Sequence, residues 1–224
     1  MIDNIWLPLT LAVYIGAVEL RVVIRTPVWN PTLIAIAILG GLLLATHQPY
    51  AQYAHGTHIL DRMLPVSVVA LALPLYRERE ILFRNGAILI VAIVAGTLSA
   101  IAAGWAVAQL LHWPADWSLA MASRTATSPI AIALATELHG AAGLSAVVTI
   151  ITGIIGAVLG PGWLTIIRIK HPIARGVAMG VTSSAIGTAR SLEENQTAGA
   201  AASLGMGLGG ILVAIILPLL LHYA

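Results

Sequence analysis

The sequence has few charged residues, and this shortage decides its class. Its 224 residues include eleven basic and nine acidic side chains, or 9% charged, whereas a soluble domain carries about 25% because its surface faces water. The apolar share is 59% and the mean hydropathy is +0.95. Several apolar runs approach the roughly 20 residues that cross a hydrocarbon core of about 30 Å. The composition therefore predicts an all-α integral membrane protein and excludes a secreted enzyme, a DNA-binding domain and a disordered segment.

Cysteine is absent, which excludes disulfides, thiol catalysis and cysteine-based metal sites. There is no Gly-x-Ser-x-Gly, His-Glu-x-x-His or P-loop motif, so we predict a protein that is not an enzyme. His55 and His58 are spaced like metal ligands, but no acidic cluster completes a site, and we expect them in a loop, with no metal or other cofactor. The net charge of +2 is scattered, which predicts no nucleic-acid partner. The first four residues lack the basic region of a signal peptide, so the first apolar helix is expected to be retained.

Six stretches have the length and composition of membrane spans, and Trp and Tyr residues lie near their ends, as at membrane interfaces. The predicted spans are 5–22, 31–47, 58–76, 86–111, 141–167 and 198–222. Two further apolar segments, 117–139 and 171–197, are interrupted by hydroxyls, small residues and charges. These two segments are the unusual part of the sequence.

Basic residues in short loops favour the cytoplasmic side and so predict the topology. The basic clusters are Arg21 and Arg25; Arg77, Arg79 and Arg84; and Arg168, Lys170 and Arg175. With the N-terminus outside, all three clusters lie inside if 117–139 is a re-entrant hairpin from the outer face and 171–197 one from the inner face. Alternatively both segments span fully, which puts the third cluster outside, against the charge rule. Broken helices at membrane depth need protein or a water-filled cavity around them.

A weak internal repeat accompanies the two hairpins. A shift of 56 residues sets 128–160 against 184–216 with nine identities, among them Ser128 with Ser184 and Glu137 with Glu193. Inverted repeats with broken helices are a recurrent plan of secondary transporters. We therefore expect one polytopic domain over 1–224, with scaffold helices in 1–113 and an inverted-repeat transport core in 117–222.

The first interrupted segment carries Arg124, the most informative single residue. Arginine at membrane depth costs about 2.5–3.5 kcal/mol on insertion scales and faces a partner or a cavity. The alternative is that Arg124 lies near the outer headgroups and extends its side chain to them. Thr125, Thr127 and Ser128 could donate to a carboxylate, and Pro129 suits the first position of a half-helix whose N-terminus attracts anions.

The second interrupted segment offers Ser183, Ser184, Gly187 and Thr188, whose hydroxyls and small side chains allow close approach to a ligand. The alternative is ordinary packing of membrane helices, where small residues are common. Four charged residues are candidates for coupling to an ion gradient. They are Glu137, Arg190, Glu193 and Glu194, of which the last three are spaced for ion pairs along one helix face or form a solvated helix end.

Several longer motifs resemble a known family. They are TSPIA at 127–131, IITGIIGAVLGP at 150–161, IKHPIARG at 169–176, AIGTARSLEE at 185–194 and LALPLY at 71–76. These stretches resemble the LrgB/CidB family of bacterial membrane proteins over about residues 15–222. The family usually has lysine where Arg124 stands and often has histidine where Ser184 stands, so coupling or pH response could differ in this chain.

The resemblance implies two functions. The family was first described as antiholin-like or holin-like regulators of murein hydrolases and autolysis. Its plant relative is a plastidic glycolate/glycerate translocator, and bacterial members are linked to pyruvate and related carboxylates. We therefore expect a multi-pass protein of the bacterial inner membrane that carries small monocarboxylates, with the lysis regulator or pore as the alternative. The expected partners are a second copy in a dimer and a companion membrane protein of the LrgA/CidA type.

Overall fold

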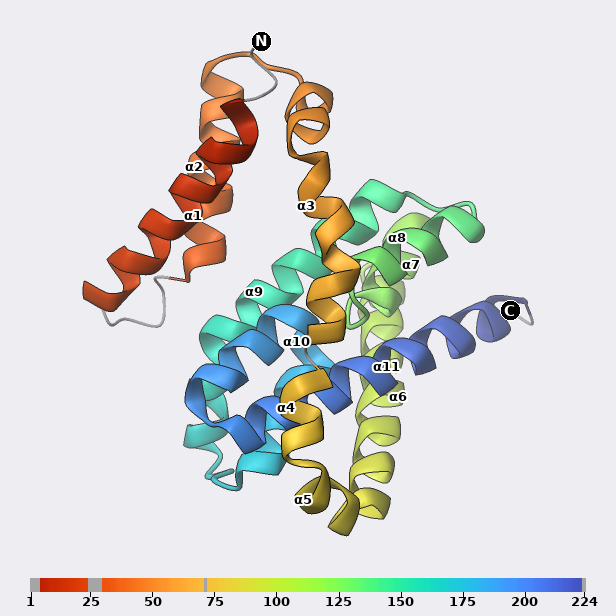
Figure 1. Ribbon diagram of the computed structural model, residues 1–224. Helices are drawn as coiled ribbons and strands as arrows, with labels where there is room; N and C mark the ends of the chain where they lie inside the picture. Colours follow the sequence, from red (N-terminus) through yellow and green to blue (C-terminus); the bar gives the residue numbers. More distant parts are fainter. Residues whose placement is uncertain (1–4, 24–29, 71, 223–224) are drawn as a thin grey trace. The chain divides into compact units, whose positions relative to one another are not determined.

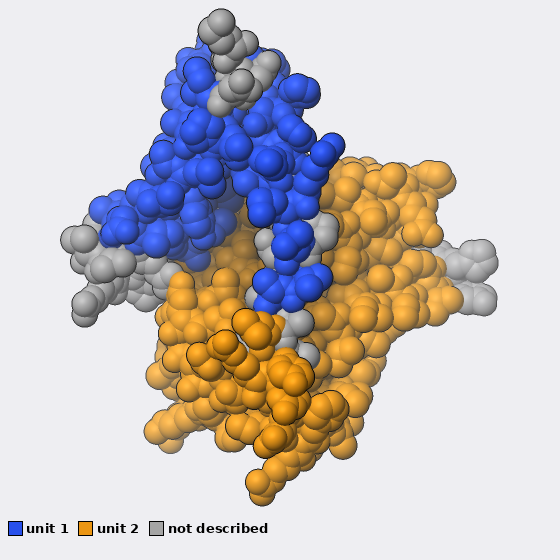
Figure 2. Space-filling model, in the orientation of Figure 1, with its two compact units in different colours: residues 1–70 blue, residues 71–224 orange. Residues whose placement is uncertain are grey.

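The computed structural model describes residues 5–23, 30–70 and 72–222, and these ranges are helical with no β-strand (Figure 1). The helices are α1 Trp6–Val23, α2 Pro31–Ala45, α3 Tyr50–Ala70, α4 Ala72–Arg77, α5 Arg79–Arg84, α6 Gly86–Leu110, α7 Ala115–Ser123, α8 Ser128–Glu137, α9 Ala142–Ile166, α10 Pro172–Glu194 and α11 Gln196–His222. The chain forms two compact units, residues 1–70 and 71–224, which Figure 2 colours separately.

The first unit contains α1, α2 and α3. The indole of Trp6 meets the ring of Tyr53 edge to face at 5.7 Å, and the hydroxyl of Thr10 lies 3.2 Å from that of Tyr53, so aromatic and polar contacts join α1 to α3. The Asn30 side chain accepts from the amide of Thr32 at 2.9 Å and caps the start of α2.

Three helices of the second unit have the length and apolarity of membrane spans, namely α6, α9 and α11. Each span has 25 residues and is about 37 Å long at 1.5 Å per residue, enough to cross a bilayer. They coincide with the predicted spans 86–111, 141–167 and 198–222. With the LrgB-type motifs, they identify a multi-pass membrane protein.

The predicted spans of the first half differ from the helices. Within the described ranges, α1 and α2 are apolar but shorter than the three long helices. The predicted span 58–76 falls on α3, which already begins at Tyr50, and on α4, with residue 71 between them outside the described residues. His55 and His58 lie inside α3, not in the expected loop, and Arg62 lowers the apolarity of that helix further. Six full spans therefore remain a prediction.

The first interrupted segment forms a helical hairpin, hairpin 1, made of α7, residues 124–127 and α8. Its two ends are adjacent, since a Cβ on Gly140 would lie 3.5 Å from Asp116 Oδ1. Its first arm runs antiparallel to α6, as Gln109 Nε2 donates to Ser118 Oγ at 3.5 Å and Arg124 reaches Ala100. The chain therefore turns back at 124–127, within the run of charged and hydroxyl residues that predicted a break.

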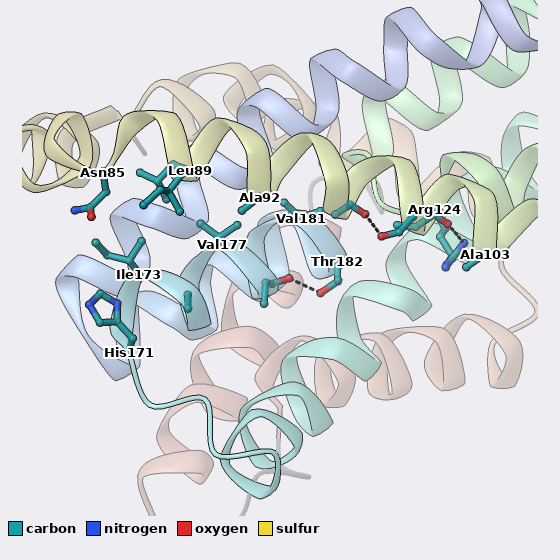
Figure 3. Close-up of a pocket in the computed structure, with 16 residues that line it drawn as sticks. Asn85, Leu89, Ala92, Ala103, Arg124, His171, Ile173, Val177, Val181 and Thr182 are labelled. Carbon is teal, nitrogen blue, oxygen red and sulfur yellow. Dashed lines mark hydrogen bonds between the residues drawn. The ribbon is translucent and has the colours of Figure 1, made fainter.

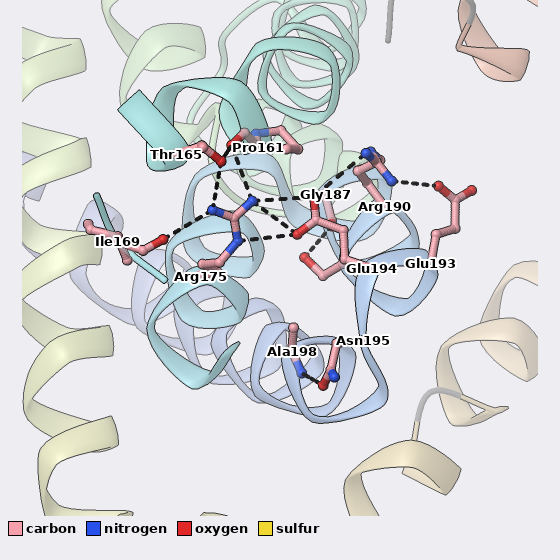
Figure 4. Close-up of polar contacts among 11 residues, drawn as sticks. Pro161, Thr165, Ile169, Arg175, Gly187, Arg190, Glu193, Glu194, Asn195 and Ala198 are labelled. Carbon is pink, nitrogen blue, oxygen red and sulfur yellow. Dashed lines mark hydrogen bonds and ion pairs between the residues drawn. The ribbon is translucent and has the colours of Figure 1, made fainter. Parts of the chain in front are cut away.

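The second interrupted segment, α10, is also a hairpin, hairpin 2. Its backbone breaks at Ser184, where φ is 49° and ψ is −134°, giving arms 172–183 and 185–194. Arg175 of the first arm pairs with Glu194 at the end of the second arm, with 3.2 Å between Nη2 and Oε2 (Figure 4). A straight helix would separate these residues by about 28 Å, so the pair shows that the chain doubles back.

Small residues let hairpin 2 pack closely on both neighbouring long helices. A Cβ on Gly176 or Gly180 would overlap the carbonyls of Ala198 and Ala202 in α11, and a Cβ on Gly156 of α9 would overlap Ser183 Oγ. Glycines four residues apart allow such backbone contact in membrane helices.

The two hairpins enter from opposite ends of α9 and end near the middle of the long helices. Hairpin 1 leads into the start of α9, whereas Arg175 of hairpin 2 donates to the Pro161 and Ile169 carbonyls at its end. The tip of hairpin 1 reaches Ala100 of α6, and the tip of hairpin 2 lies against Gly156 of α9. An inverted repeat that relates the two hairpins remains a prediction.

Two buried apolar clusters flank the level of these tips. One, the inner cluster, contains Leu82, Leu89, Ile93, Ile173, Val177, Val181, Ala200 and Ala201. The other, the outer cluster, contains Ile101, Leu119, Ala122, Ala126, Leu134, Ala135, Val213 and Leu217. Between them lies Thr97 of α6, where a Cβ on Gly209 of α11 would be 3.2 Å from the Thr97 hydroxyl.

Candidate functional site

A cavity of about 730 Å³ lies between α6 and the first arm of hairpin 2 (Figure 3). Both hairpins contribute to it, hairpin 1 through Arg124 and hairpin 2 through Thr182. Its residues are Asn85, Ile88, Leu89, Ala92, Gly96, Ser99, Ala100, Ala103, Arg124, His171, Ile173, Ala174, Val177, Ala178, Val181 and Thr182. The wall is mostly apolar, with polar side chains at its two ends and beside Thr182.

Among the described residues that line the cavity, Arg124 is the only arginine, lysine or acidic residue, and it is held by the backbone. Its Nη1 donates to the Met121 carbonyl at 2.6 Å and to the Ala100 carbonyl at 3.0 Å, so it bridges hairpin 1 and α6. Among the side chains that the structure describes, no acidic one forms an ion pair with it. Its positive charge is therefore oriented by dipoles of the protein and is not neutralised by a carboxylate of the described chain.

Small residues on α6 make room for this arginine. A Cβ on Gly104 would overlap both Arg124 Nη1 and the Met121 carbonyl, and Gly104 follows Gly96 and Ala100 at intervals of four. Residues four apart lie on one helix face, so this face of α6 carries no large side chain. The close approach of hairpin 1 to α6 depends on these small residues.

On the opposite wall, the last turn of the first arm presents hydroxyls. Thr182 Oγ1 donates to the Ala178 carbonyl at 2.7 Å and lies 3.2 Å from Ser183 Oγ. Ser184 follows at the break, where its buried hydroxyl has no hydrogen-bond partner in the part of the chain that the structure describes. Within the second arm, Thr188 Oγ1 donates to the Ser184 carbonyl at 2.9 Å, and Gly187 packs against Met179 and Ser183.

The other predicted binding residues of hairpin 1 do not line the cavity. Thr125 is buried and its hydroxyl has no partner in the described chain, Thr127 and Ser128 are half-buried, and Pro129 is exposed. Thr127 is the N-cap of α8 without a side-chain cap bond, and Pro129 lies in the first turn, as predicted. Of the nine predicted substrate-binding residues, Arg124 alone lines the cavity.

Several buried hydroxyls have no hydrogen-bond partner among the described residues. Thr125 and Ser184 lie at the hairpin tips and Thr97 lies on α6 between the two clusters, whereas Ser145 and Thr149 lie in the first two turns of α9. A buried hydroxyl without a hydrogen bond costs about 1–3 kcal/mol, so such groups call for water or a ligand. The tips are therefore polar inside an otherwise apolar unit.

Three of the four charged residues proposed for coupling lie at the base of hairpin 2, and none of the four lines the cavity. Arg190 pairs with Glu193 at 3.2 Å and with Glu194 at 3.6 Å, as its spacing predicted (Figure 4). Arg175 donates from all three guanidinium nitrogens, to Glu194, to Thr165 Oγ1 and to two carbonyls at the end of α9. Glu137 is exposed at the end of α8.

Sequence reasoning missed the part that α6 takes in the site. Residues 85–103 were assigned to a scaffold, yet they form one whole wall of the cavity. The signal was present in Gly96, Ala100 and Gly104, whose spacing marks a close-packed face. Arg175 was counted only for its charge, because its partner Glu194 is 19 residues away.

Comparisons with known proteins agree with the motifs that resemble the LrgB/CidB family. A family model described as the LrgB-like family matches residues 10–223. The chain is 32% identical over 215 residues to YwbG of Bacillus subtilis, covering 96% of both chains. It is 30% identical over 213 residues to the holin-like protein CidB of Staphylococcus aureus, covering 95% of this chain and 93% of the relative. No solved structure matches the chain.

Proposed function

We propose that this chain, which belongs to the LrgB-like family, is a secondary transporter of small monocarboxylates such as pyruvate, glycolate, glycerate or lactate. The site is the cavity at Arg124, and the proposed location is the bacterial inner membrane with the N-terminus outside. The proposal assigns the chain no catalysis.

The arginine without an acidic partner is the observation that carries this proposal. Arg124 Nη1 is occupied by two carbonyls, whereas Nε and Nη2 donate to no group in the described ranges. Those two nitrogens form one edge of the guanidinium, and this edge matches the two oxygens of a carboxylate. An anion with a single carboxylate would pair with that edge and neutralise the half-buried charge.

The hydroxyls around the hairpin tips support a substrate with a second polar group. In the proposal, Thr125, Thr127, Ser128 and Pro129, in the first turn of α8, assist Arg124 from hairpin 1. Ser183, Ser184, Gly187 and Thr188 complete the site from hairpin 2. The unpartnered Ser184 hydroxyl is suited to a 2-oxo or 2-hydroxyl oxygen.

The opposed hairpins support alternating access. Broken helices that enter from both sides and meet at a substrate site occur in transporters, where one group of helices moves against another. We propose Glu137, Arg190, Glu193 and Glu194 as the groups that couple transport to protons or sodium. Glu194 already pairs with two arginines, so protonation there would weaken the base of hairpin 2.

A holin-like regulator of murein hydrolase export and autolysis is the second candidate, because the CidB relative is named holin-like. Such a role requires association with further copies or with an LrgA/CidA-type companion. It does not require an arginine held at the wall of a cavity, which is why we rank it second.

Uptake of labelled pyruvate and glycolate into proteoliposomes separates these functions. A transporter gives saturable uptake that an unlabelled competitor reduces and that responds to a proton or sodium gradient. A pore gives flux that rises linearly with concentration, and a regulator gives no flux. Because only this chain is reconstituted, saturable uptake would also show that the companion protein is not needed.

A further inference from the structure

The cavity at Arg124 is elongated and follows α6 for most of its length (Figure 3). Its lining begins at Asn85 and His171 and continues to Ala103 and Arg124. Asn85 to Ala100, where Arg124 is bound, is about 22 Å at 1.5 Å per residue. A three-carbon carboxylate fills a small part of such a space, so the cavity is long enough to be a path as well as a site.

The end at Asn85 and His171 is rich in positive charge. Arg84 precedes Asn85, and Arg168 and Lys170 precede His171; all three are exposed. Glu194 on the same face is paired with Arg175, Glu78 accepts a hydrogen bond from Thr197 at 3.1 Å, and Glu80 is exposed one turn before Arg84. A mouth flanked by exposed cations raises the local concentration of anions.

The other end of the cavity is closed by packed side chains. Beyond Arg124, Ile101 of α6 belongs to the outer cluster with Leu119, Ala122 and Leu217, all of them buried. Gly104 and Met121 are in backbone contact at this level. The cavity is therefore a groove along α6 that is closed beyond Arg124, next to the outer cluster.

We propose that this groove is the access path by which small monocarboxylate anions reach Arg124 from the face that carries Arg168 and Lys170, and that the structure is the state open to that face. This inference rests on the proposed function for the identity of the anion. By the charge rule this face is cytoplasmic. The occupant of the groove is water with the passing anion, drawn by the cations at the mouth and by Arg124.

Because the chain has no cysteine, single cysteines introduced into it can be labelled without background. Ala92→Cys, Ala103→Cys and Ala178→Cys place a thiol in the groove. Ala102→Cys and Ala106→Cys are matched controls on the same helix, because these residues line a separate apolar depression with Leu217 and Leu220. The probe is a charged, membrane-impermeant methanethiosulfonate applied to vesicles of known orientation that contain the full chain.

We expect the three groove cysteines to be modified rapidly when the reagent is applied to the cytoplasmic face. This rate should be at least tenfold higher than their rate from the outer face, and at least tenfold higher than the rate of the two control cysteines from either face. Pyruvate or glycolate should slow modification at Ala103→Cys, beside Arg124, more than at Ala92→Cys. Groove cysteines that react no faster than the controls would overturn the proposal, as would modification from the outer face alone. Fast modification that neither carboxylate slows would leave the path intact and contradict the proposed substrates.

Discussion

Arg175 and Glu194 hold the two arms of hairpin 2 together at its base, with three donor–acceptor distances of 3.2–3.4 Å although 19 residues separate them in the chain. The same guanidinium donates to the Pro161 and Ile169 carbonyls, so it also fixes the end of α9. The side chains are only 16% and 24% exposed, which limits screening by water. Arg175 thus joins the two arms of hairpin 2 to each other and to the end of α9.

Replacing Arg175 with Gln should destabilise the protein by about 1–3 kcal/mol, because Glu194 and two carbonyls lose a charged donor. The melting temperature in detergent measures this effect. Arg168→Gln removes an exposed charge from the same face and should leave the melting temperature nearly unchanged. Equal effects of the two substitutions would show that the ion pair at the base of hairpin 2 does not stabilise it.

The turn at Ser184 predicts an unusual response to glycine. A φ of 49° with ψ of −134° is strained for a residue with a side chain, at a cost of about 1–3 kcal/mol. Ser184→Gly relieves this strain, offset by about 0.5–1 kcal/mol of added chain entropy, and should raise the melting temperature. Ser184→Val should lower it, because a β-branched side chain tolerates this conformation poorly.

Ser191→Gly is the matched control for the turn, since Ser191 is buried in the regular part of the second arm and donates to the Gly187 carbonyl at 2.9 Å. Glycine there should destabilise the protein by about 0.5–1 kcal/mol, because helix propensity falls and the hydrogen bond is lost, and the melting temperature should fall. A fall on Ser184→Gly as well would mean that the chain does not turn at Ser184.

Gly104 should not tolerate even one added methyl group. In Gly104→Ala the Cβ meets Arg124 Nη1 and the Met121 carbonyl, so hairpin 1 must move away from α6. We expect a lower melting temperature together with a raised KM for uptake. In α9, Gly162 has open space around it, and Gly162→Ala should stabilise that helix by up to about 1 kcal/mol without changing KM. Unchanged KM and stability in Gly104→Ala would contradict the contact between Arg124 and α6.

Local composition was enough to predict where the two segments are interrupted, and the placement of the basic residues favoured hairpins over full spans. Hydroxyls and charges around Arg124 and Ser184 interrupt apolar runs, and the helices break at or beside these residues. The long spans also followed from uninterrupted apolar composition, within one or two residues for α6 and α9. These features depend on neighbouring residues, which a single sequence records directly.

Contacts between distant segments were not predictable in the same way. Arg175 meets Glu194 only because the chain turns back at Ser184, and the partners of Arg124 are backbone carbonyls, which every residue has. In the first half, α3 starts at Tyr50 although His55 and His58 made the segment polar, because a helix needs no continuous apolar run. Pairing and packing of this kind are decided by tertiary structure.

Arg124 as the binding group for the substrate carboxylate is the central claim, and the dependence of pyruvate uptake on this side chain tests it most directly. Saturable uptake should lose about 10- to 100-fold in affinity or disappear in Arg124→Ala, as expected for a charged hydrogen-bonded pair worth about 1.5–3 kcal/mol. Arg124→Lys should keep part of the uptake, since the charge remains but the two-nitrogen edge is lost. Arg79→Ala, which removes an exposed arginine stacked on Tyr76, should behave like the unmodified chain. Saturable uptake with an unchanged KM in Arg124→Ala would contradict the account.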